Sequence, residues 1–186
     1  AFAFSYPHLL EGWREAGAEI IPFSPLNDEA PDKDAGFIYL PGGYPELHAA
    51  QLSNAETFRH GMTKAAERDV QIFGECGGYM VLGCGLTDKT GTRFDMLDLL
   101  PVETSFAEPK LHLGYRQASL AQSCFLGDAG TQFRAHEFHY SAVITEDRSS
   151  PLFSLKDASD RELPTAGIMR GKIAGSYIHL IDGVVS

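Results

Sequence analysis

The stretch that decides the fold is Val70-Gln71-Ile72-Phe73-Gly74-Glu75-Cys76-Gly77-Gly78-Tyr79-Met80-Val81-Leu82-Gly83. A short apolar run ends in a glycine-flanked turn, and a second apolar segment with helical character follows. This order of strand, sharp turn and helix is typical of a nucleophile elbow, in which the reactive side chain stands at the apex of the turn. The glycines permit a strained backbone and close packing that larger residues would block.

Cys76 occupies the apex of this turn, at the expected N-terminus of the helix. The helix dipole and the free N–H groups at a helix N-terminus favour a thiolate. The alternative interpretation is an inert cysteine buried in a glycine-rich turn, and for a lone cysteine it would be preferred. The three surrounding glycines and the strand-turn-helix order favour Cys76 as a nucleophile.

The composition indicates one ordinary globular domain with a real core. The chain has 186 residues, 44% of them hydrophobic and 22% charged, with a formal net charge of −10. This acidity argues against nucleic-acid binding, and no apolar stretch is long enough to cross a membrane. The three cysteines form no CxxC pair, which argues against a disulfide framework or a zinc knuckle and favours the reducing cytoplasm.

The first half of the chain shows a repeated β-loop-α rhythm. Such a rhythm predicts an α/β domain with a doubly wound, mainly parallel sheet, helices on both faces and a site at the carboxyl ends of the strands. Ser53 and Glu56 match a capping box for the helix that ends near Arg68. The other expected helix is Tyr6–Ala16, with Gly17 as its C-cap, and Pro25–Ala35 is expected to be a loop. Ala1–Phe4 is expected to be the end of a strand, and the full strands expected are Glu19–Phe23, Phe37–Leu40 and Val70–Phe73.

The second half alternates apolar and polar residues and predicts an extension of antiparallel strands. The residues 149–164 are charged and irregular and predict a surface loop. A hairpin is expected at 165–178, with His179 directly after its second strand. The expected strands before it are Val102–Ala107, Leu113–Leu120 and Phe133–Ile144, with a turn at Gly127–Gly130.

A thiol nucleophile requires a base, and an oxyanion requires donors. His179 ends an apolar strand, although a structural histidine there is about as common. Gly42 and Gly43 follow a buried strand, so their N–H groups can point into the same cleft; the alternative is an ordinary turn. His136 and His139 have opposite parity on one strand, which disfavours a shared metal, and we expect no metal. No nucleotide-binding motif is present.

Four blocks of the sequence together resemble the glutaminase domain of cobyrinic or hydrogenobyrinic acid a,c-diamide synthases. This domain is a flavodoxin-like, triad-type (class I) glutamine amidotransferase. The blocks occur in the family's order and span nearly the whole chain. They are Leu40-Pro41-Gly42-Gly43-Tyr44-Pro45-Glu46-Leu47-His48, Gly74-Glu75-Cys76-Gly77-Gly78-Tyr79-Met80, Arg134-Ala135-His136-Glu137-Phe138-His139-Tyr140-Ser141 and Gly175-Ser176-Tyr177-Ile178-His179-Leu180.

The resemblance implies a role for each matching residue. Cys76 corresponds to the nucleophile, His179 to the base, and Gly43 and Gly77 to the oxyanion-hole positions, with Gly42 beside them. The implied supporting residues are His136, Glu137 and His139. The resemblance also implies that glutamine is hydrolysed and that ammonia passes to an N-terminal synthetase domain, where ATP and Mg²⁺ serve the amidation of a corrinoid at the domain interface.

The whole chain, residues 1–186, is then one glutaminase domain that carries no cofactor of its own. The chain begins without Met, so we expect it to be a fragment of a longer polypeptide whose ATP-binding domain is absent here. We expect the oxyanion hole to be completed only when the partner domain sets the Gly42–Gly43 loop. The Gly43 N–H would then point away from Cys76 in at least some states of the isolated domain.

Three departures from the common class I pattern affect this reading. Met80 stands where a glutamine is usual, which favours the diamide synthase over cobyric acid synthase. Ile181 replaces the acidic residue two positions after the histidine, so the third triad member is absent or comes from elsewhere. Glu75 is not assigned that role, because it adjoins Cys76 on a tight turn. Ala135 replaces a usual glycine, and the family's last helix is missing.

Other readings remain open at this point. A relative that amidates nickel-sirohydrochlorin, or cobyric acid synthase, would use the same chemistry. A papain-like or DJ-1-like cysteine hydrolase also carries a cysteine on an α/β elbow, but the Gly42–Gly43 turn and the Tyr-Ile-His segment disfavour it. A non-catalytic scaffold domain is disfavoured because both Cys76 and His179 are retained.

Overall fold

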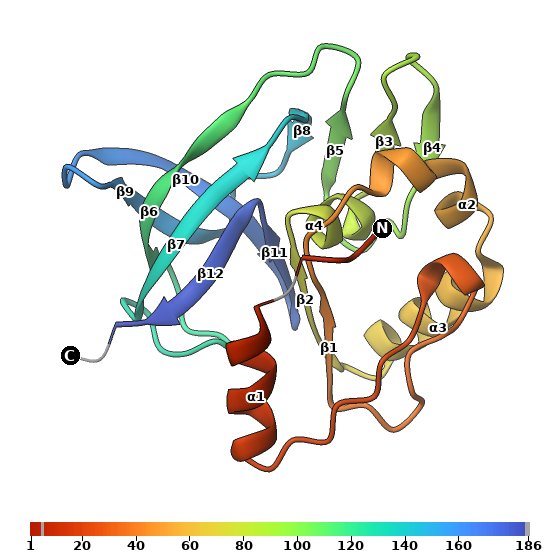
Figure 1. Cartoon of the computed structure of the whole chain (residues 1–186), viewed down its shortest axis with the longest axis horizontal. Helices are drawn as coiled ribbons and strands as arrows, with labels where there is room; N and C mark the ends of the chain where they lie inside the picture. The colour runs from red at the N-terminus through yellow and green to blue at the C-terminus, as the bar shows by residue number, and fades with distance from the viewer. Residues whose placement is uncertain (5, 185–186) are drawn as a thin grey trace.

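The computed structural model describes residues 1–4 and 6–184, and its elements are labelled in Figure 1. The helices are α1 (Pro7–Glu15), η1 (Pro25–Asn27), η2 (Pro45–His48), α2 (Ala49–Ser53), α3 (Glu56–Glu67) and α4 (Gly77–Leu82). The strands are β1 (Phe37–Leu40), β2 (Gln71–Glu75), β3 (Gly85–Thr87), β4 (Arg93–Asp95), β5 (Val102–Ser105), β6 (His112–Leu120), β7 (Gln132–His139), β8 (Ala142–Glu146), β9 (Pro151–Asp157), β10 (Glu162–Arg170), β11 (Ile173–Ser176) and β12 (Ile178–Gly183). In the described part of the chain, no helix combines the length and apolarity that a membrane span needs.

The predicted elbow forms the centre of the molecule. β2 lies between β1 and β11 and is parallel to both, so the predicted parallel neighbours Phe37–Leu40 and Val70–Phe73 are confirmed. β2 is buried from its second residue onward, as expected for a parallel strand covered on both faces. α4 follows after a single residue, Cys76.

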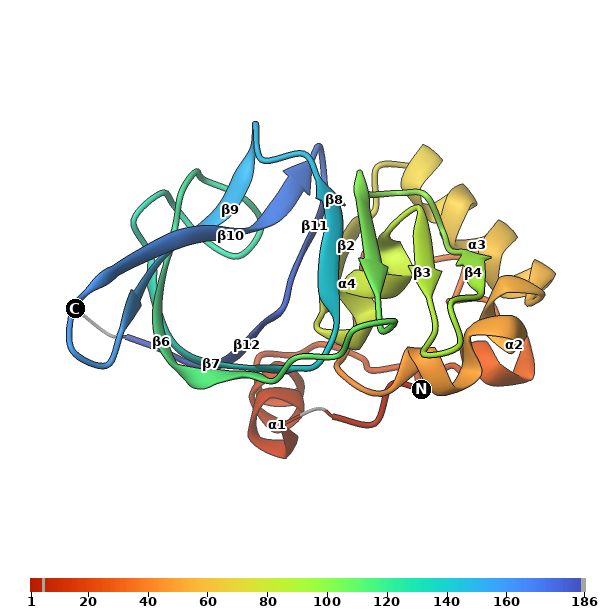
Figure 2. The same cartoon turned by 90° about the horizontal axis from the view of Figure 1, so that it is seen from above.

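The large sheet is mixed, with the order β1-β2-β11-β10-β9-β6-β7-β12. The α/β fold is confirmed, but the expected mainly parallel pairing needs correction, because only β1, β2 and β11 are parallel neighbours and the remaining pairs are antiparallel. A second, small sheet has the order β4-β3-β5-β8. Figure 2 shows the large sheet curling, so that β6, β7 and β12 face β9 and β10.

This curl decides where the site forms. β11 and β12 are separated in sequence by Tyr177 alone, yet β11 pairs with β2 whereas β12 lies at the opposite edge, paired with β7. The chain therefore leaves the parallel part of the sheet at Tyr177 and starts a new strand beside the end of β2. His179 lies on this new strand and does not follow the hairpin's second strand directly, which corrects its predicted position.

Helices pack on both faces of β1, as predicted. Ile38 and Leu40 are buried in one core cluster with residues of α2, α3 and α4. Tyr39 points to the other face, where its ring meets Trp13 of α1 edge-on, with 5.4 Å between the ring centroids. This alternation follows from the period of two in a strand. The C-cap of α1 is Ala16 and not Gly17 as predicted; Gly17 follows it with φ 92°, the left-handed conformation that is common just after a helix.

Three predictions in the first half are wrong. Ala1–Phe4 forms an isolated bridge from Phe4 to Gly42 and no strand. Glu19–Phe23 forms no strand either, and Pro22 removes a donor that pairing would need. The capping box of Ser53 is not used, because Ser53 ends α2; instead the Asp28 carboxylate accepts the Phe58 N–H at 2.9 Å in the first turn of α3.

In the second half, residues 149–164 are mostly not a loop. They contain β9 and the start of β10, which pair as antiparallel strands and bury Leu152, Phe153 and Leu155. The predicted segment Phe133–Ile144 is divided into β7 and β8 at Tyr140 and Ser141. The predicted hairpin is confirmed as β10 and β11, with Arg170 paired to Ile173.

Gly78 provides a stability test of the elbow. A Cβ at Gly78 would overlap the backbone carbonyl of Leu40, so helix α4 can approach β1 only because this position lacks a side chain. We expect Gly78→Ala to lower the free energy of unfolding by about 3 kcal/mol in urea denaturation. Gly12→Ala is the matched control, because nothing lies within 4 Å of the new methyl group on α1, and it should stabilise by about 0.5 kcal/mol.

Candidate active site

Cys76 is held in a strained conformation at the end of β2. Its φ of 49° and ψ of −102° are unusual for a residue with a side chain, and such strain is concentrated at functional sites. The Cys76 N–H donates to the Ser176 carbonyl at 2.8 Å, and the thiol donates to the Phe138 carbonyl at 3.6 Å. The elbow therefore fixes the sulfur between β11 and β7, where it is almost fully buried.

His179 and Glu75 form a buried pair beside this cysteine. His179 Nδ1 lies 3.2 Å from Glu75 Oε1, and the two residues are only 3% and 1% exposed. A Cβ at Gly42 would lie 2.6 Å from His179 Cε1 and 3.5 Å from Cys76 Cβ, so the imidazole and the cysteine border the same small space. A cysteine, an imidazole and a carboxylate are thus arranged in the order that a catalytic triad requires.

Glu75 is the residue that sequence reasoning passed over. It seemed unsuitable because it adjoins Cys76, but the strained turn separates the two side chains, and the β11–β2 pairing sets Ser176 opposite Glu75, three residues before His179. The Glu75 carboxylate also accepts the Tyr39 hydroxyl and the Leu180 N–H, each at 3.1 Å. Burial, and then the charge of Glu75, raise the pKa of Tyr39, so its hydroxyl keeps the proton that it donates. An acidic residue at the end of an apolar run was the available signal.

The surroundings of His179 favour its protonated form. Burial by itself lowers the pKa of His179, but the hydrogen-bonding and charge of Cys76 and Glu75 outweigh it and raise the pKa to about 9. Within the described residues, His179 Nε2 is buried and has no hydrogen-bond partner in normal geometry. The contact with the thiol is therefore loose, as is common for catalytic pairs before substrate binds.

The raised pKa predicts a pH dependence of stability. The folded protein holds the His179 proton more tightly than the unfolded chain, so the stabilisation is complete below the ordinary pKa of 6.5 and is lost as pH rises through about 9. We expect the wild type to lose up to about 3 kcal/mol more than His179→Gln between pH 6.5 and 10 in chemical denaturation. His60→Gln, at an exposed site on α3, should keep the wild-type dependence.

Two glycine turns approach one another next to Cys76. A Cβ at Gly77 would lie 2.8 Å from the Gly43 nitrogen, so the two backbones can come this close only without side chains. Among the described residues, neither the Gly43 nor the Gly77 N–H donates a recorded hydrogen bond. The pair thus has the free donors that an oxyanion hole needs. The orientation of the Gly43 N–H in the isolated domain stays a prediction.

His136 lies behind His179 as a neutral neighbour. Their rings stack at a centroid distance of 4.6 Å with 4° between the planes, and a hydrogen bond joins His136 Nε2 to the Tyr6 hydroxyl. Burial, and then the charge of His179, lower the pKa of His136. This neutral ring fixes the orientation of the catalytic candidate without competing for its proton.

His139 and Glu137 belong to a neighbouring ionic network. His139 contacts the Ser141 carbonyl and the Glu137 carboxylate, each at 3.0 Å, and Arg116 holds the other Glu137 oxygen at 2.7 Å. Burial raises the pKa of Glu137, but hydrogen bonds from His139 and Arg116 reverse this effect and lower it to about 2. His139 also lines the cavity at Cys76, so this network supports the site from one side.

Among the described residues, one group could offer three metal ligands: His112, Glu137 and His139. The rings of His112 and His139 are stacked at 4.5 Å with 3° between their planes, so their lone pairs point side by side and do not converge on one ion. Arg116 already neutralises the carboxylate. We therefore assign no metal to this group, and the expected absence of a metal stays a prediction.

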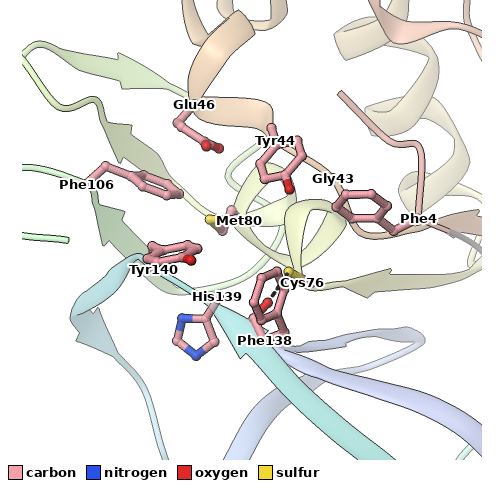
Figure 3. Close-up of a pocket in the computed structure, with 10 residues that line it drawn as sticks. All are labelled: Phe4, Gly43, Tyr44, Glu46, Cys76, Met80, Phe106, Phe138, His139 and Tyr140. Carbon is pink, nitrogen blue, oxygen red and sulfur yellow. Dashed lines mark hydrogen bonds between the residues drawn. The ribbon is translucent and has the colours of Figure 1, made fainter. Parts of the chain in front are cut away.

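A narrow cavity leads to Cys76, and Figure 3 shows the side chains around it. Its free volume is about 20 Å³, room for about one water molecule. Met80, at the position where the common pattern has glutamine, lines the cavity and is buried. The lining residues are Phe4, Gly43, Tyr44, Glu46, Cys76, Met80, Phe106, Phe138, His139 and Tyr140.

The mixed α/β sheet and the cysteine elbow are those of a glutamine amidotransferase domain. The fold is shared with solved structures of low sequence identity. A structure titled glutamine amidotransferase aligns over 91% of this chain and 82% of its own, with a TM-score of 0.56 and 14% identity. A glutamine amidotransferase from Thermotoga maritima aligns over 92% of this chain and 68% of its own chain, with a TM-score of 0.57 and 15% identity.

The sequence identifies the family more closely. The chain belongs to the CobB/CobQ-like glutamine amidotransferase domain family, which it matches over residues 6–183. It is 58% identical over 182 residues to a hydrogenobyrinate a,c-diamide synthase of a Sinorhizobium species and 53% identical to one of Brucella abortus. Each match covers 98% of this chain but 41% of the relative, so the chain spans about two fifths of the length of these proteins.

Proposed function

We propose that this chain is the glutaminase domain of a hydrogenobyrinate or cobyrinate a,c-diamide synthase in cobalamin biosynthesis. The domain hydrolyses glutamine and supplies ammonia for amidation of the a and c carboxylates. The observation that carries the proposal is the buried Glu75–His179 pair beside the strained Cys76. The relatives named hydrogenobyrinate a,c-diamide synthase support the choice of pathway.

In the first half of the proposed reaction, the Cys76 thiolate attacks the side-chain amide carbon of glutamine. The carbonyl oxygen takes up negative charge, which the N–H groups of Gly43 and Gly77 stabilise. His179, protonated at neutral pH, then donates its proton to the departing nitrogen. Ammonia leaves, and a thioester joins the Cys76 sulfur to the glutamyl carbon.

In the second half, the neutral His179 removes a proton from water as the water attacks the thioester. The same two glycines stabilise the second oxyanion, and the Cys76 sulfur leaves as the thiolate. Glutamate is released, and His179 is again protonated. Glu75 acts throughout as the positioning residue that holds the imidazole through Nδ1 and stabilises its charge.

The remainder of the longer protein would complete the synthase. We propose that a synthetase domain N-terminal to this chain binds ATP and Mg²⁺ and activates the corrinoid carboxylates, with the corrinoid near the domain interface. The share of 41% of the relatives' length leaves room for such a domain. We place this activity in the cytoplasm, where free thiols persist, and the structure's cysteines are all unpaired.

A substrate panel tests this function. The longer synthase containing this chain is given glutamine, ATP and Mg²⁺ with hydrogenobyrinic acid, cobyrinic acid or nickel-sirohydrochlorin in parallel. We expect glutamate release and two successive amidations of the first or second substrate by mass spectrometry. Preference for nickel-sirohydrochlorin, or amidation of carboxylates other than a and c, would change the proposed pathway but leave the proposed glutaminase activity standing. Absence of glutamate release would overturn the proposal.

A further inference from the structure

Glu46 carries a buried carboxylate oxygen that the protein leaves without a partner. It lies in η2, three residues beyond Gly43, and it lines the same cavity as Cys76. Within the described residues, its Oε2 atom is buried and has no hydrogen-bond partner. Figure 3 shows this carboxylate directed toward the space between Met80 and Tyr44.

Among the described residues, neither a lysine nor an arginine lines the cavity at Glu46. Burial raises the pKa of Glu46, and its own backbone N–H acts in the opposite sense. The cavity is otherwise lined mainly by aromatic side chains and Met80, and its one basic residue, His139, is committed to the Ser141 carbonyl and Glu137. A carboxylate oxygen that is buried without a partner is unfavourable, so a ligand that brings a cationic donor to it gains binding energy here.

We propose that Glu46 is a specificity-determining residue that accepts the α-ammonium group of glutamine. The inference rests on the proposed glutaminase function, because the same cavity must place the side-chain amide of the substrate at Cys76. Glutamine carries a cationic ammonium group at one end and a neutral amide at the other. Glu46 and Cys76, which border one cavity, match these two ends.

For glutamine to reach Glu46 and Cys76 at the same time, the cavity that they line must open. Its present volume of about 20 Å³ is too small for glutamine. Three of its aromatic residues stand at the surface, with Phe4 41%, Tyr44 43% and Tyr140 43% exposed, and these are the rings that would have to move outward. The ion pair with Glu46 would form as these rings move aside, which makes binding selective for a substrate that carries an ammonium group.

The test compares glutamine with glutaramate, which has the same side-chain amide but lacks the α-amino group. Glutamate or glutarate release is measured with the longer synthase. We expect the wild type to prefer glutamine by about 10- to 100-fold in kcat/KM, and Glu46→Gln to lose most of this preference. The loss should arise from a higher KM for glutamine, with glutaramate hydrolysis unchanged.

Two further variants make the result specific. Glu46→Asp keeps the charge and should retain part of the preference, whereas Glu11→Gln removes an exposed carboxylate on α1 and should behave as the wild type. Equal losses on glutamine and glutaramate, or an unchanged preference in Glu46→Gln, would overturn the role of Glu46 while the glutaminase function stands. A wild-type synthase that hydrolyses neither amide would overturn both proposals.

Discussion

Cys76→Ala should abolish glutamine-dependent amidation by the longer synthase and leave amidation with free ammonia intact. In the proposed mechanism the Cys76 sulfur forms the bond to the substrate, so its loss removes the covalent route entirely. We expect glutamate release to fall by at least about 10³-fold. The ammonia-dependent reaction should persist, because the proposed synthetase site lies on another domain.

Cys124→Ala is the matched control, because Cys124 is a second free thiol, located in the turn between β6 and β7. It should retain both activities. Labelling with iodoacetamide should modify Cys76 in the wild type and stop glutamine hydrolysis. If Cys76→Ala still releases glutamate at a wild-type rate, another group is the nucleophile. If both nitrogen sources fail together in a folded variant, the two activities are not separable as proposed.

Glu75→Gln should have the second-largest effect. The amide preserves the size of the side chain but cannot stabilise the imidazolium of His179, so kcat should fall by on the order of 10²- to 10⁴-fold with little change in KM. The same change should lower the pKa of His179, which is now raised to about 9 partly by this carboxylate. NMR titration of the His179 ring provides a readout that is independent of turnover.

Glu146→Gln separates this effect from the general cost of altering a buried acid. Glu146 is a largely buried carboxylate that accepts the Tyr79 hydroxyl at 2.7 Å, and an amide oxygen can replace that acceptor. It should leave kcat nearly unchanged. A Glu75→Gln enzyme with wild-type kcat and an unshifted His179 titration would show that the carboxylate only fills space.

The central elements could be predicted because their signals are local. Phe37–Leu40 and the run before Cys76 are short, continuous and apolar, which is the pattern of strands buried on both faces, and the glycines around Cys76 define the turn. The proposed nucleophile, Cys76, and the proposed base, His179, also lie in recognisable segments. Their approach to one another depends on the curl of the large sheet, which no local pattern shows.

The errors arose where distant residues decide the local structure. Ser53 and Glu56 form a valid capping pattern, but Asp28, from 30 positions earlier, caps the helix instead. The charged residues around Asp157 and Glu162 concealed a hairpin whose apolar side chains Leu152, Phe153 and Leu155 are buried in the curled sheet. Glu75 was discounted because it adjoins Cys76 in the sequence. Its partner, His179, lies 104 positions later in the chain, so no pattern in the sequence showed that the two side chains meet.

The curl of the sheet at Tyr177 also determines when activity can arise. Gly42, Cys76 and His179 come from widely separated parts of the chain, and β12, which carries the histidine, is the last strand among the described residues. During synthesis on the ribosome, the earlier strands emerge first, while the imidazole is still untranslated or within the exit tunnel. Contacts of such high sequence separation form slowly. A nascent or incompletely folded chain would therefore hold the cysteine elbow before its proposed base, His179, is in place.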